Sequence, residues 1–298
     1  MENTKIYNRI RGALYGVAVG DALGGPLEFM SAGAIQKQHG RVTEMIGGGW
    51  LDLDPGEVTD DTQMTMAVAR GIAADPEDPI PAIGKNFIAW YESAPKDVGG
   101  CCATAIVIAK HTSAKTAQDW MSVGARVALI REGGNAGNGA LMRTIYPAIY
   151  YADPEKRHYM TKAIGAMTHD NQESIAICED YADAVYAAIF SIHPSLSINR
   201  RHYTPGADPS GYVVDTWSNV IESILDTETF AGAVCEAVNR GGDADTIGAI
   251  TGGLAGAYYG YNAIPQRWIA HLDEELREEL DHLAELAYEA NVAYWKEE

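Results

Sequence analysis

The chain has 298 residues, enough to bury a large core without help from disulfides or structural metals. Its 41 acidic and 22 basic side chains give a formal charge of −19, which excludes the basic surface expected of a nucleic-acid binder or of a protein drawn to anionic membranes. The four cysteines show no zinc-ligand spacing and the N-terminus shows no secretory signal, so we expect a reduced, cytoplasmic setting.

The predicted elements are helices. Apolar residues recur at three- and four-residue spacing along most of the chain, and the alanines among them favour helix. We find no series of alternating strands and no linker or low-complexity run, so the sequence predicts one all-α domain over residues 1–298. In chain order the predicted helices are Ile6–Ala22, Thr62–Ala74, Ala82–Tyr91, Ala117–Ile130, Leu141–Tyr151, Ile175–Ile192, Tyr212–Leu225 and Trp268–Tyr288.

Two stretches lie outside this pattern. Pro194–Pro209 is the longest irregular polar stretch, and we expect a surface loop there. Thr246–Gln266 carries no charge and approaches membrane-spanning length, but its proline, asparagine, tyrosines and glycines favour a buried helix. We therefore do not expect an integral membrane protein.

Glycine recurs at every fourth position in two segments, at 12, 16, 20 and 24 and again at 248, 252, 256 and 260. A glycine inside a helix costs about 1 kcal/mol relative to alanine, so four on one face require a compensating contact. Close approach of a neighbouring helix backbone is such a contact. Our hypothesis is that these two helices lie at the centre of the fold and pack on each other.

Two short segments carry the candidate chemistry, and each is a loop that leads into a helix. The first is Val58-Thr59-Asp60-Asp61-Thr62-Gln63 and the second is Gly241-Gly242-Asp243-Ala244-Asp245-Thr246. Either segment alone is typical of a helix N-terminus, because threonine and aspartate cap helices well. A cap needs only one acid, however, and the Gly-Gly pair lets the second loop fold tightly around a ligand.

If the two acidic loops converge, four carboxylates crowd together and need a cation to stay ionised. Carboxylate and hydroxyl oxygens favour Mg²⁺ or Mn²⁺, and the absence of histidine and cysteine from both segments disfavours zinc. Four acids can hold two ions about 3.5–4 Å apart. From the residues alone we expect metal-assisted chemistry on an oxygen-rich ligand.

Several motifs occur in a characteristic order. They are Gly20-Asp21-Ala22-Leu23-Gly24 followed by Glu28, then Thr59-Asp60-Asp61, Gly137-Asn138-Gly139-Ala140-Leu141-Met142-Arg143 and Gly241-Gly242-Asp243-Ala244-Asp245-Thr246. In this combination the chain resembles the ADP-ribosylglycohydrolases from about Ile10 to Leu272. Three further motifs are similar to the bacterial branch of that family that acts on dinitrogenase reductase, namely Gly47-Gly48-Gly49-Trp50-Leu51, Asp97-Val98-Gly99 and Val214-Asp215-Thr216.

The resemblance implies an all-α fold with a binuclear Mg²⁺ or Mn²⁺ centre that hydrolyses the N-glycosidic bond between ADP-ribose and a protein arginine. Its metal ligands carry over to Thr59, Asp60, Asp61, Asp243, Asp245 and Thr246, and its ADP-ribose contacts to Asp97, Gly99, Gly100, Asn138, Gly139 and His169. The candidate catalytic residues are Glu28, Asp60, Asp61 and Asp97. Gly100-Cys101-Cys102 departs from the family pattern, in which we expect more polar residues.

The candidate substrate contacts also have structural interpretations. The backbone N–H groups of Gly99-Gly100 and Gly137-Asn138-Gly139 can approach a diphosphate, although such glycines also make ordinary turns. His169 is either a partner of the ligand or a structural residue near a helix start.

Three aromatic residues, Tyr212, Tyr146 and Trp50, can stack on adenine, but aromatic side chains at helical spacing more often belong to the core. Of the three, Tyr212 is the one kept as a candidate substrate contact. For Arg143 we expect pairing with a local carboxylate rather than with phosphate.

The resemblance favours the arginine linkage, with the nitrogenase iron protein as target, and implies PII-type signal proteins and an ammonium channel as regulatory partners. We expect Glu28 to act as general base or to position the ribose, and Asp97 to protonate the departing guanidine. Three alternatives stay open: hydrolysis of another linkage such as serine, two-metal phosphohydrolysis, and ADP-ribose binding without turnover. The intact acidic motifs argue against the last of these.

Overall fold

The computed structural model describes residues 2–132, 134–191 and 198–297, and within these ranges it contains helices and three isolated β-bridges but no strand. The predicted all-α fold is confirmed. In chain order the elements are α1 (Glu2–Gly24), η1 (Gly25–Leu27), α2 (Ala32–His39), α3 (Asp60–Ala74), α4 (Ile80–Glu92), α5 (Gly100–Thr112), α6 (Ala117–Ile130), η2 (Leu141–Arg143), α7 (Ile145–Tyr150), α8 (Pro154–Ala166), α9 (Gln172–Phe190), α10 (Val213–Leu225), α11 (Phe230–Val238), α12 (Ala244–Tyr259), η3 (Tyr261–Ala263), α13 (Gln266–Ile269) and α14 (Glu274–Glu297).

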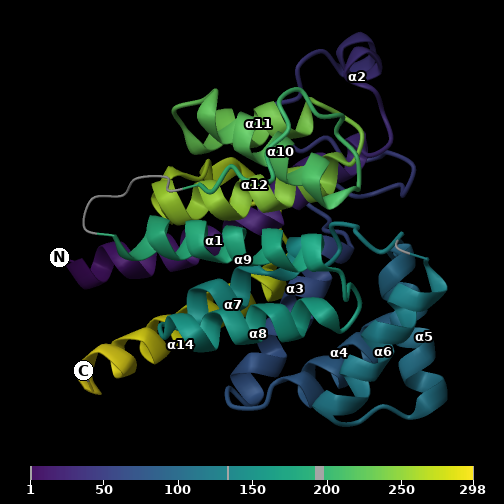
Figure 1. The fold of residues 1–298 in the computed structure, drawn as a ribbon. Helices are drawn as coiled ribbons and strands as arrows, with labels where there is room; N and C mark the ends of the chain where they lie inside the picture. The colour runs from purple at the N-terminus through teal and green to yellow at the C-terminus, as the bar shows by residue number, and fades with distance from the viewer. Residues whose placement is uncertain (1, 133, 192–197, 298) are drawn as a thin grey trace.

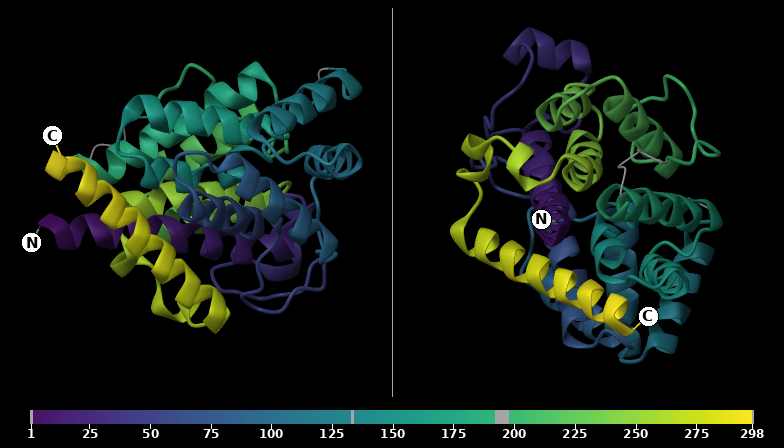
Figure 2. Two further views of the ribbon diagram at one scale, coloured as in Figure 1. Left: turned by 90° about the horizontal axis from the view of Figure 1, so that it is seen from below. Right: turned by 90° about the vertical axis from the view of Figure 1, so that its left-hand side faces the viewer.

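Helices α1 and α12 lie side by side at the centre of the molecule and run antiparallel (Figure 1, Figure 2). Their glycine faces meet, and the facing pairs are Gly12 with Gly256, Gly16 with Gly252 and Gly20 with Gly248. A Cβ atom at any of these positions would collide with a backbone carbonyl across the contact, so the approach requires glycine. The hypothesis that these two helices pack centrally on each other is confirmed.

The fourth glycine of each series has a different role. Gly24 lies against Ala244, at the start of α12. Gly260 adopts a φ of 81° just after α12, and its N–H donates to the carbonyl of Gly256 at 2.8 Å. The predicted helix over Thr246–Gln266 was therefore too long, because a glycine in the left-handed region ends α12 at Tyr259.

Two predicted helices are each divided in the structure. The segment Leu141–Tyr151 forms η2 and α7, because Pro147 has no N–H to donate and fits only in the first turn of a new helix. The segment Trp268–Tyr288 is divided between α13 and α14, and the side chain of Asp273 accepts a backbone N–H at the start of α14. Periodicity also missed four helices, α2, α5, α8 and α11.

The remaining predictions agree closely with the structure. The predicted helix Ile175–Ile192 corresponds to α9, and its last residue lies outside the described residues. Of the predicted surface loop Pro194–Pro209, residues 198–209 are described and are non-helical and mostly solvent-accessible. Within the described ranges, every helix is too short or too polar to span a bilayer.

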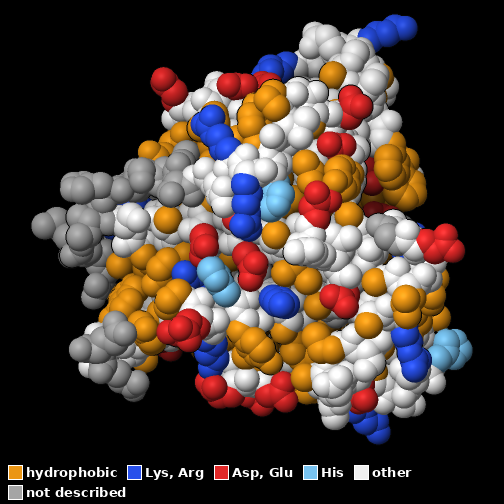
Figure 3. Space-filling view, viewed as in Figure 1, with side chains coloured by type: hydrophobic (Ala, Val, Ile, Leu, Met, Phe, Trp, Pro, Cys, Tyr) orange, Lys and Arg blue, Asp and Glu red, His pale blue; other side chains and the backbone are white. Residues whose placement is uncertain are grey.

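The outer helices surround the α1–α12 pair. Helices α10 and α11 pack on α12, α3 and α14 pack on α1, and α4, α5 and α6 form a group beyond α3 (Figure 1). Acidic side chains are spread over the face seen in Figure 3, between apolar and basic ones. This arrangement brings the end of α1 and the beginnings of α3, α5 and α12 to one region of the molecule, where the predicted site residues lie.

Candidate active site

A cavity of about 510 Å³ opens where the end of α1 meets the first turns of α3, α5 and α12. Most of the predicted site residues line it, namely Glu28, Asp60, Asp97, Gly99, Gly100, Asn138, Gly139, His169, Asp243, Asp245 and Thr246. Thr59 and Asp61 are buried behind this lining. One wall of the cavity consists of carboxylates, and we call it the acidic wall; its lining residues are Glu28, Asp60, Asp97, Asp243 and Asp245. The other consists of glycine-rich loops, and we call it the amide wall; its lining residues include Gly99, Gly100, Gly137, Asn138 and Gly139.

The start of α3 is capped by Asp21, a residue of α1. Its carboxylate accepts hydrogen bonds from the N–H and hydroxyl of Thr59, at 3.1 and 2.8 Å, and from the N–H of Thr62 at 3.0 Å. The capping function is therefore supplied from outside the α3 sequence. Asp60 and Asp61 are not needed as caps, which favours the functional interpretation of this motif over the structural one.

The start of α12 approaches α3 from the other side of the acidic wall. Gly241 and Gly242 have φ values of 74° and 64°, and this tight turn places Asp243 and Asp245 at the cavity. The hydroxyl of Thr246 donates to Asp61 at 3.2 Å, across the two helix starts. The two acidic loops thus converge, as the sequence analysis expected.

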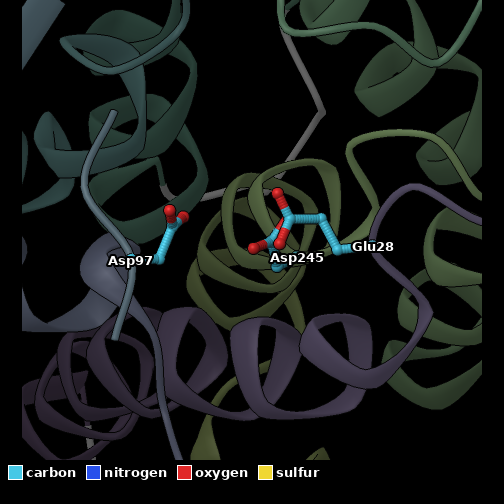
Figure 4. A group of neighbouring side chains, drawn as sticks. All are labelled: Glu28, Asp97 and Asp245. Atoms are coloured by element: carbon cyan, nitrogen blue, oxygen red, sulfur yellow. The ribbon is translucent and has the colours of Figure 1, made fainter. Parts of the chain in front are cut away.

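Glu28 and Asp97 complete the acidic wall from two further loops. One carboxylate oxygen each of Glu28, Asp97 and Asp245 lies within 4.8 Å of the others. The three side chains come from three separate parts of the chain (Figure 4). Glu28 also accepts a hydrogen bond of 2.6 Å from the indole N–H of Trp50. This contact ties the Trp50 loop to the edge of the acidic wall.

Burial is the main cause of unusual carboxyl pKa values in the acidic wall. It raises the pKa of Asp60 to about 8, of Glu28 to about 7 and of Asp21 to about 6, and the charges of neighbouring acids add to the first two shifts. The pKa values of Asp61 and Asp245 are raised as well, again by burial and by nearby carboxylates. Among the described residues, no lysine or arginine forms an ion pair with any member of the wall.

This wall could hold a hard divalent cation. Its donors are carboxylate and hydroxyl oxygens, which suit Mg²⁺ or Mn²⁺ better than zinc. Oδ1 of Asp61 is buried and accepts no hydrogen bond from any described residue, so a strong acceptor is left unsatisfied beside the wall. A cation there would relieve the repulsion that raises these pKa values.

The amide wall faces these acids. The N–H of Gly99, at the start of α5, donates to Asp60 at 3.2 Å. The side chain of Asn138 donates to both Asp243 and Thr216 and so fixes the Gly137–Gly139 loop against the start of α12. The guanidinium of Arg131 lies over Gly100, where a Cβ atom would come within 2.7 Å of it, and it has no carboxylate partner among the described residues. This side of the cavity therefore suits an anion.

His169 packs on the same glycine-rich loop. A Cβ atom on Gly139 would lie 2.9 Å from its ring, and Nδ1 of His169 is 2.7 Å from the hydroxyl of Thr168. Burial, with the charges of Arg143 and Arg131, lowers the pKa of His169 to about 3. The imidazole is therefore neutral at physiological pH and offers the cavity a polar, uncharged edge.

The expectation for Arg143 was wrong, and Tyr146 belongs to the core, which is the more common role of an aromatic side chain at helical spacing. Arg143 does not pair with a carboxylate; it is fully buried and donates to the carbonyls of Gly139 and Ile164 and to the hydroxyl of Thr168. It thus anchors the amide wall from behind, and burial lowers its pKa. Tyr146 cannot stack on a ligand, because its ring lies in the core and its hydroxyl donates to Leu283.

Tyr212 lies beside the cavity rather than in its lining. Its side chain is 42 % exposed, and its hydroxyl donates to Glu173 at 2.6 Å. The residues just before it, Ser210 and Gly211, do line the cavity. Trp50 also lines it, but on the acidic side, where it bonds to Glu28.

Sequence reasoning missed three residues with evident roles at the site. Asp21 lay inside a quoted motif, but nothing in a single sequence shows that it caps a helix 38 residues away. Arg131 directly follows the predicted helix Ala117–Ile130 and carried no signal beyond its charge. Phe29 follows Glu28, and its exposure at the rim became visible only in three dimensions.

Comparisons with known proteins agree with this geometry. The family model described as ADP-ribosylglycohydrolase matches residues 2–296. An ADP-ribosyl-[dinitrogen reductase] glycohydrolase of Rhodospirillum rubrum is 35 % identical over 96 % of this chain and 99 % of its own length. An ADP-ribosylarginine hydrolase of Serratia proteamaculans is 31 % identical, over 93 % of this chain and 78 % of its own.

A solved structure extends the similarity to the fold. It is described as an ADP-ribosylglycohydrolase-related protein complex and matches with a TM-score of 0.81 and 29 % identity, covering 97 % of this chain and 99 % of its own. The sequence motifs and the fold therefore indicate the same family. This chain is a member of the ADP-ribosylglycohydrolase family of enzymes.

Proposed function

We propose that the chain hydrolyses the N-glycosidic bond between ADP-ribose and an arginine of a protein, with residues 1–298 acting as one domain. The observation that carries this proposal is the pairing of the two walls: buried carboxylates, which form no ion pair with a lysine or arginine of the described ranges, face glycine-rich loops with Arg131. A ligand with one cation-binding end and one anionic end suits both walls. ADP-ribose joins a ribose, rich in hydroxyls, to a diphosphate, and relatives carry the name ADP-ribosylarginine hydrolase.

The acidic wall would hold two Mg²⁺ or Mn²⁺ ions. The ligands in this proposal are Thr59, Asp60, Asp61, Asp243, Asp245 and Thr246, all of which lie at the starts of α3 and α12. Bound there, divalent cations would neutralise the crowded carboxylates and lower the pKa of bound water. The unpartnered Oδ1 of Asp61 and the raised pKa values support this assignment.

In this proposal Glu28 and Asp97 each carry out one proton transfer. Glu28, whose pKa of about 7 lies close to neutrality, would accept a proton from the attacking water or hold a ribose hydroxyl. Asp97, with a pKa raised by burial, would deliver a proton to the departing guanidine, which is itself strongly basic. The remaining carboxylates stabilise the oxocarbenium-like character at the anomeric carbon.

The amide wall would bind the diphosphate. Backbone N–H groups of Gly100 and Gly139 and the guanidinium of Arg131 give this end the charge that a diphosphate requires. Asn138 and His169 hold the loop and offer polar edges to the ligand. Tyr212, just outside the cavity, stays a prediction for the adenine.

The finer expectations about targets also belong to this proposal. The nitrogenase iron protein is the target we propose, because a similar protein is described as acting on dinitrogen reductase. Binding of a PII-type signal protein or of an ammonium channel stays a prediction from the resemblance, and a cytoplasmic location stays a prediction from the cysteines and the N-terminal sequence.

One experiment tests the activity. The chain is incubated with arginine- and serine-ADP-ribosylated proteins, with Mn²⁺ or with a chelator, and the masses of both products are measured. We expect free ADP-ribose and intact arginine, only when the metal is present. Release of phosphate would indicate a phosphohydrolase, preference for serine would change the linkage, and saturable ADP-ribose binding without turnover would indicate a non-catalytic relative.

A further inference from the structure

The rim of the cavity beside Glu28 carries two exposed aromatic rings, which we call the aromatic rim. They are Phe29 and Trp50, and their side chains are 71 % and 53 % exposed. We propose that this rim binds the guanidinium of the target arginine and so selects arginine over neutral linkage residues. The inference rests on the proposed function, since it names the part of the cavity that takes the leaving group.

Phe29 is held at the rim at a conformational cost. Its φ is 61°, in the left-handed region that aromatic residues rarely adopt. Its N–H donates to the carbonyl of Gly242 at 2.7 Å, next to Asp243, so the turn that shapes the acidic wall also fixes this backbone. A large apolar side chain that is both strained and exposed at a cavity is the kind of feature retained for binding.

Trp50 is placed by an unusual loop. Gly47, Gly48 and Gly49 have φ values of 64°, 87° and 73°, and a Cβ atom on Gly49 would lie 2.7 Å from the backbone of Pro26. Three glycines in the left-handed region thus bring the loop down onto η1, where the indole N–H bonds to Glu28. The indole ring lies 5.4 Å from that of Phe29, centroid to centroid, at an angle of 43°.

The chemistry of this rim suits a guanidinium. Aromatic faces attract cations, and arginine stacks on them more readily than lysine because its head is planar and weakly hydrated. Among the described residues no lysine or arginine forms an ion pair with Glu28 or Asp97, so a positive charge is favoured next to them. The chain already uses this contact elsewhere: the guanidinium of Arg11 lies 3.6 Å from the ring centre of Tyr261, and that of Arg157 lies 3.9 Å from the ring centre of Tyr186.

The position of the aromatic rim in the cavity favours a contact with the guanidinium over stacking on adenine. The indole of Trp50 is bonded to Glu28, the residue that also lies within 4.8 Å of Asp97 and Asp245. In the proposed function the bond to be cleaved lies at these carboxylates, and the diphosphate lies toward Arg131. The group next to Glu28 is therefore the one attached to the anomeric carbon, which is the guanidine and not the adenine.

Phe29 gives the clean test, because it is exposed and makes no hydrogen bond with its side chain. Phe29→Leu keeps an apolar group but removes the π face, and Phe29→Tyr keeps the ring. For an ADP-ribosylarginine peptide we expect kcat/KM to fall about 2- to 30-fold in the leucine variant and to be retained in the tyrosine variant. The Kd for free ADP-ribose, which lacks a guanidinium, should be unchanged in both.

Phe29→Gly distinguishes a binding role of Phe29 from a structural one, because it should raise the melting temperature and lower kcat/KM together. Glycine relieves the strain at φ 61°, so this variant should melt at a higher temperature while losing kcat/KM to the same extent as Phe29→Leu. The matched control is Tyr159→Leu, which removes a ring that is 67 % exposed and lies away from this cavity, and which should leave kcat/KM unchanged.

Two results would overturn the inference. One is wild-type kcat/KM for the arginine substrate in Phe29→Leu; the other is a loss of ADP-ribose affinity in proportion to the loss of kcat/KM, which would place the nucleotide on the rings. Failure of the unsubstituted chain to release ADP-ribose from the arginine peptide is a separate outcome. It would overturn the proposed function before any variant is compared.

Discussion

The α1–α12 pair has two regions that make opposite contributions to stability. Along most of its length glycines meet and the two backbones pack directly, which favours the folded chain. At one end the same helices bring together Asp21, Asp243 and Asp245, whose burial and mutual repulsion oppose folding. The first region needs no ligand for its stability, whereas in the proposed function bound cations would neutralise the carboxylates of the second. The turns that stabilise the fold and the turns that carry the candidate site residues are therefore adjacent in α1 and α12.

The largest effect is expected in the glycine contact. Gly16→Leu should prevent folding, because its Cβ would overlap the carbonyl of Gly252 and neither backbone can move aside. Even Gly16→Ala should lower the free energy of unfolding by roughly 3 kcal/mol. Circular dichroism and thermal melts measure both. Gly33→Ala is the control, since Gly33 lies in exposed α2 with no heavy atom within 4 Å of a Cβ, and it should melt at or above the wild-type temperature. Normal melting of Gly16→Leu would refute the packing argument.

Substitutions at the acidic end should abolish activity without preventing folding, unlike those in the glycine contact. Asp60→Ala or Asp245→Ala should reduce hydrolysis by at least about 10²- to 10³-fold and weaken Mn²⁺ binding, while the fold is retained. Turnover of an ADP-ribosylarginine peptide and calorimetric titration with Mn²⁺ report the two effects. Full activity of either variant in chelator-treated buffer would contradict the metal assignment.

The pH dependence of the melting temperature of the metal-free chain tests whether the acidic end opposes folding. Burial raises the folded-state pKa of Asp21 to about 6, of Glu28 to about 7 and of Asp60 to about 8, above the values near 4 of an unfolded chain. The folded state therefore holds more protons in this range, and its extra stability, complete below about pH 4, is lost as pH rises through 6 to 8. With chelator, Tm should fall across this window.

Two additions to that melting series identify the cause. Saturating Mn²⁺ should flatten the curve by binding the ionised form, and Asp60→Asn should remove its upper part. A Tm that rises with pH in chelator would show that the acidic wall is not strained when empty of cations.

The smallest effect is expected on the amide wall. Arg131→Gln should raise KM for the arginine substrate about 10-fold with little change in kcat, because in the proposed function Arg131 binds the diphosphate, away from the bond that breaks. Arg126→Gln is the matched control, since Arg126 is exposed one turn earlier on α6 and does not line the cavity. Equal KM values for the two variants would remove Arg131 from the binding site.

Much of the fold could be predicted from the sequence because its signals are local. The glycine series of α1 and α12 required a close backbone contact, and periodicity located most of the long helices. Three of the four missed helices begin at side-chain caps, and the fourth, α5, begins at Gly99 without one: Ser31, Asp153 and Thr229 each accept a backbone N–H at the start of α2, α8 and α11. Attention to these caps would have found them.

The site was predictable as a set of residue types but not as an arrangement. Asp60 and Asp243 carried their chemistry in short motifs, so their convergence could be proposed. The role of Asp21 depends on a contact between helices that are remote in the chain, and the role of Arg131 on the space that Gly100 leaves free. Arg143 was misjudged because a single sequence does not show that backbone carbonyls, rather than a carboxylate, surround it.

The contact between Gly24 and Ala244 has a consequence for motion. It joins the last turn of α1 to the first turn of α12, backbone to backbone, so the turns that carry Asp21 and Asp245 cannot separate without breaking the central pair. The proposed cation site would therefore be preorganised, and an arriving ion would not have to order its ligands. Any opening that admits a bulky protein substrate must come from the loops at the rim, the Gly47–Gly49 loop and the Pro209–Gly211 loop, while the carboxylates stay in place.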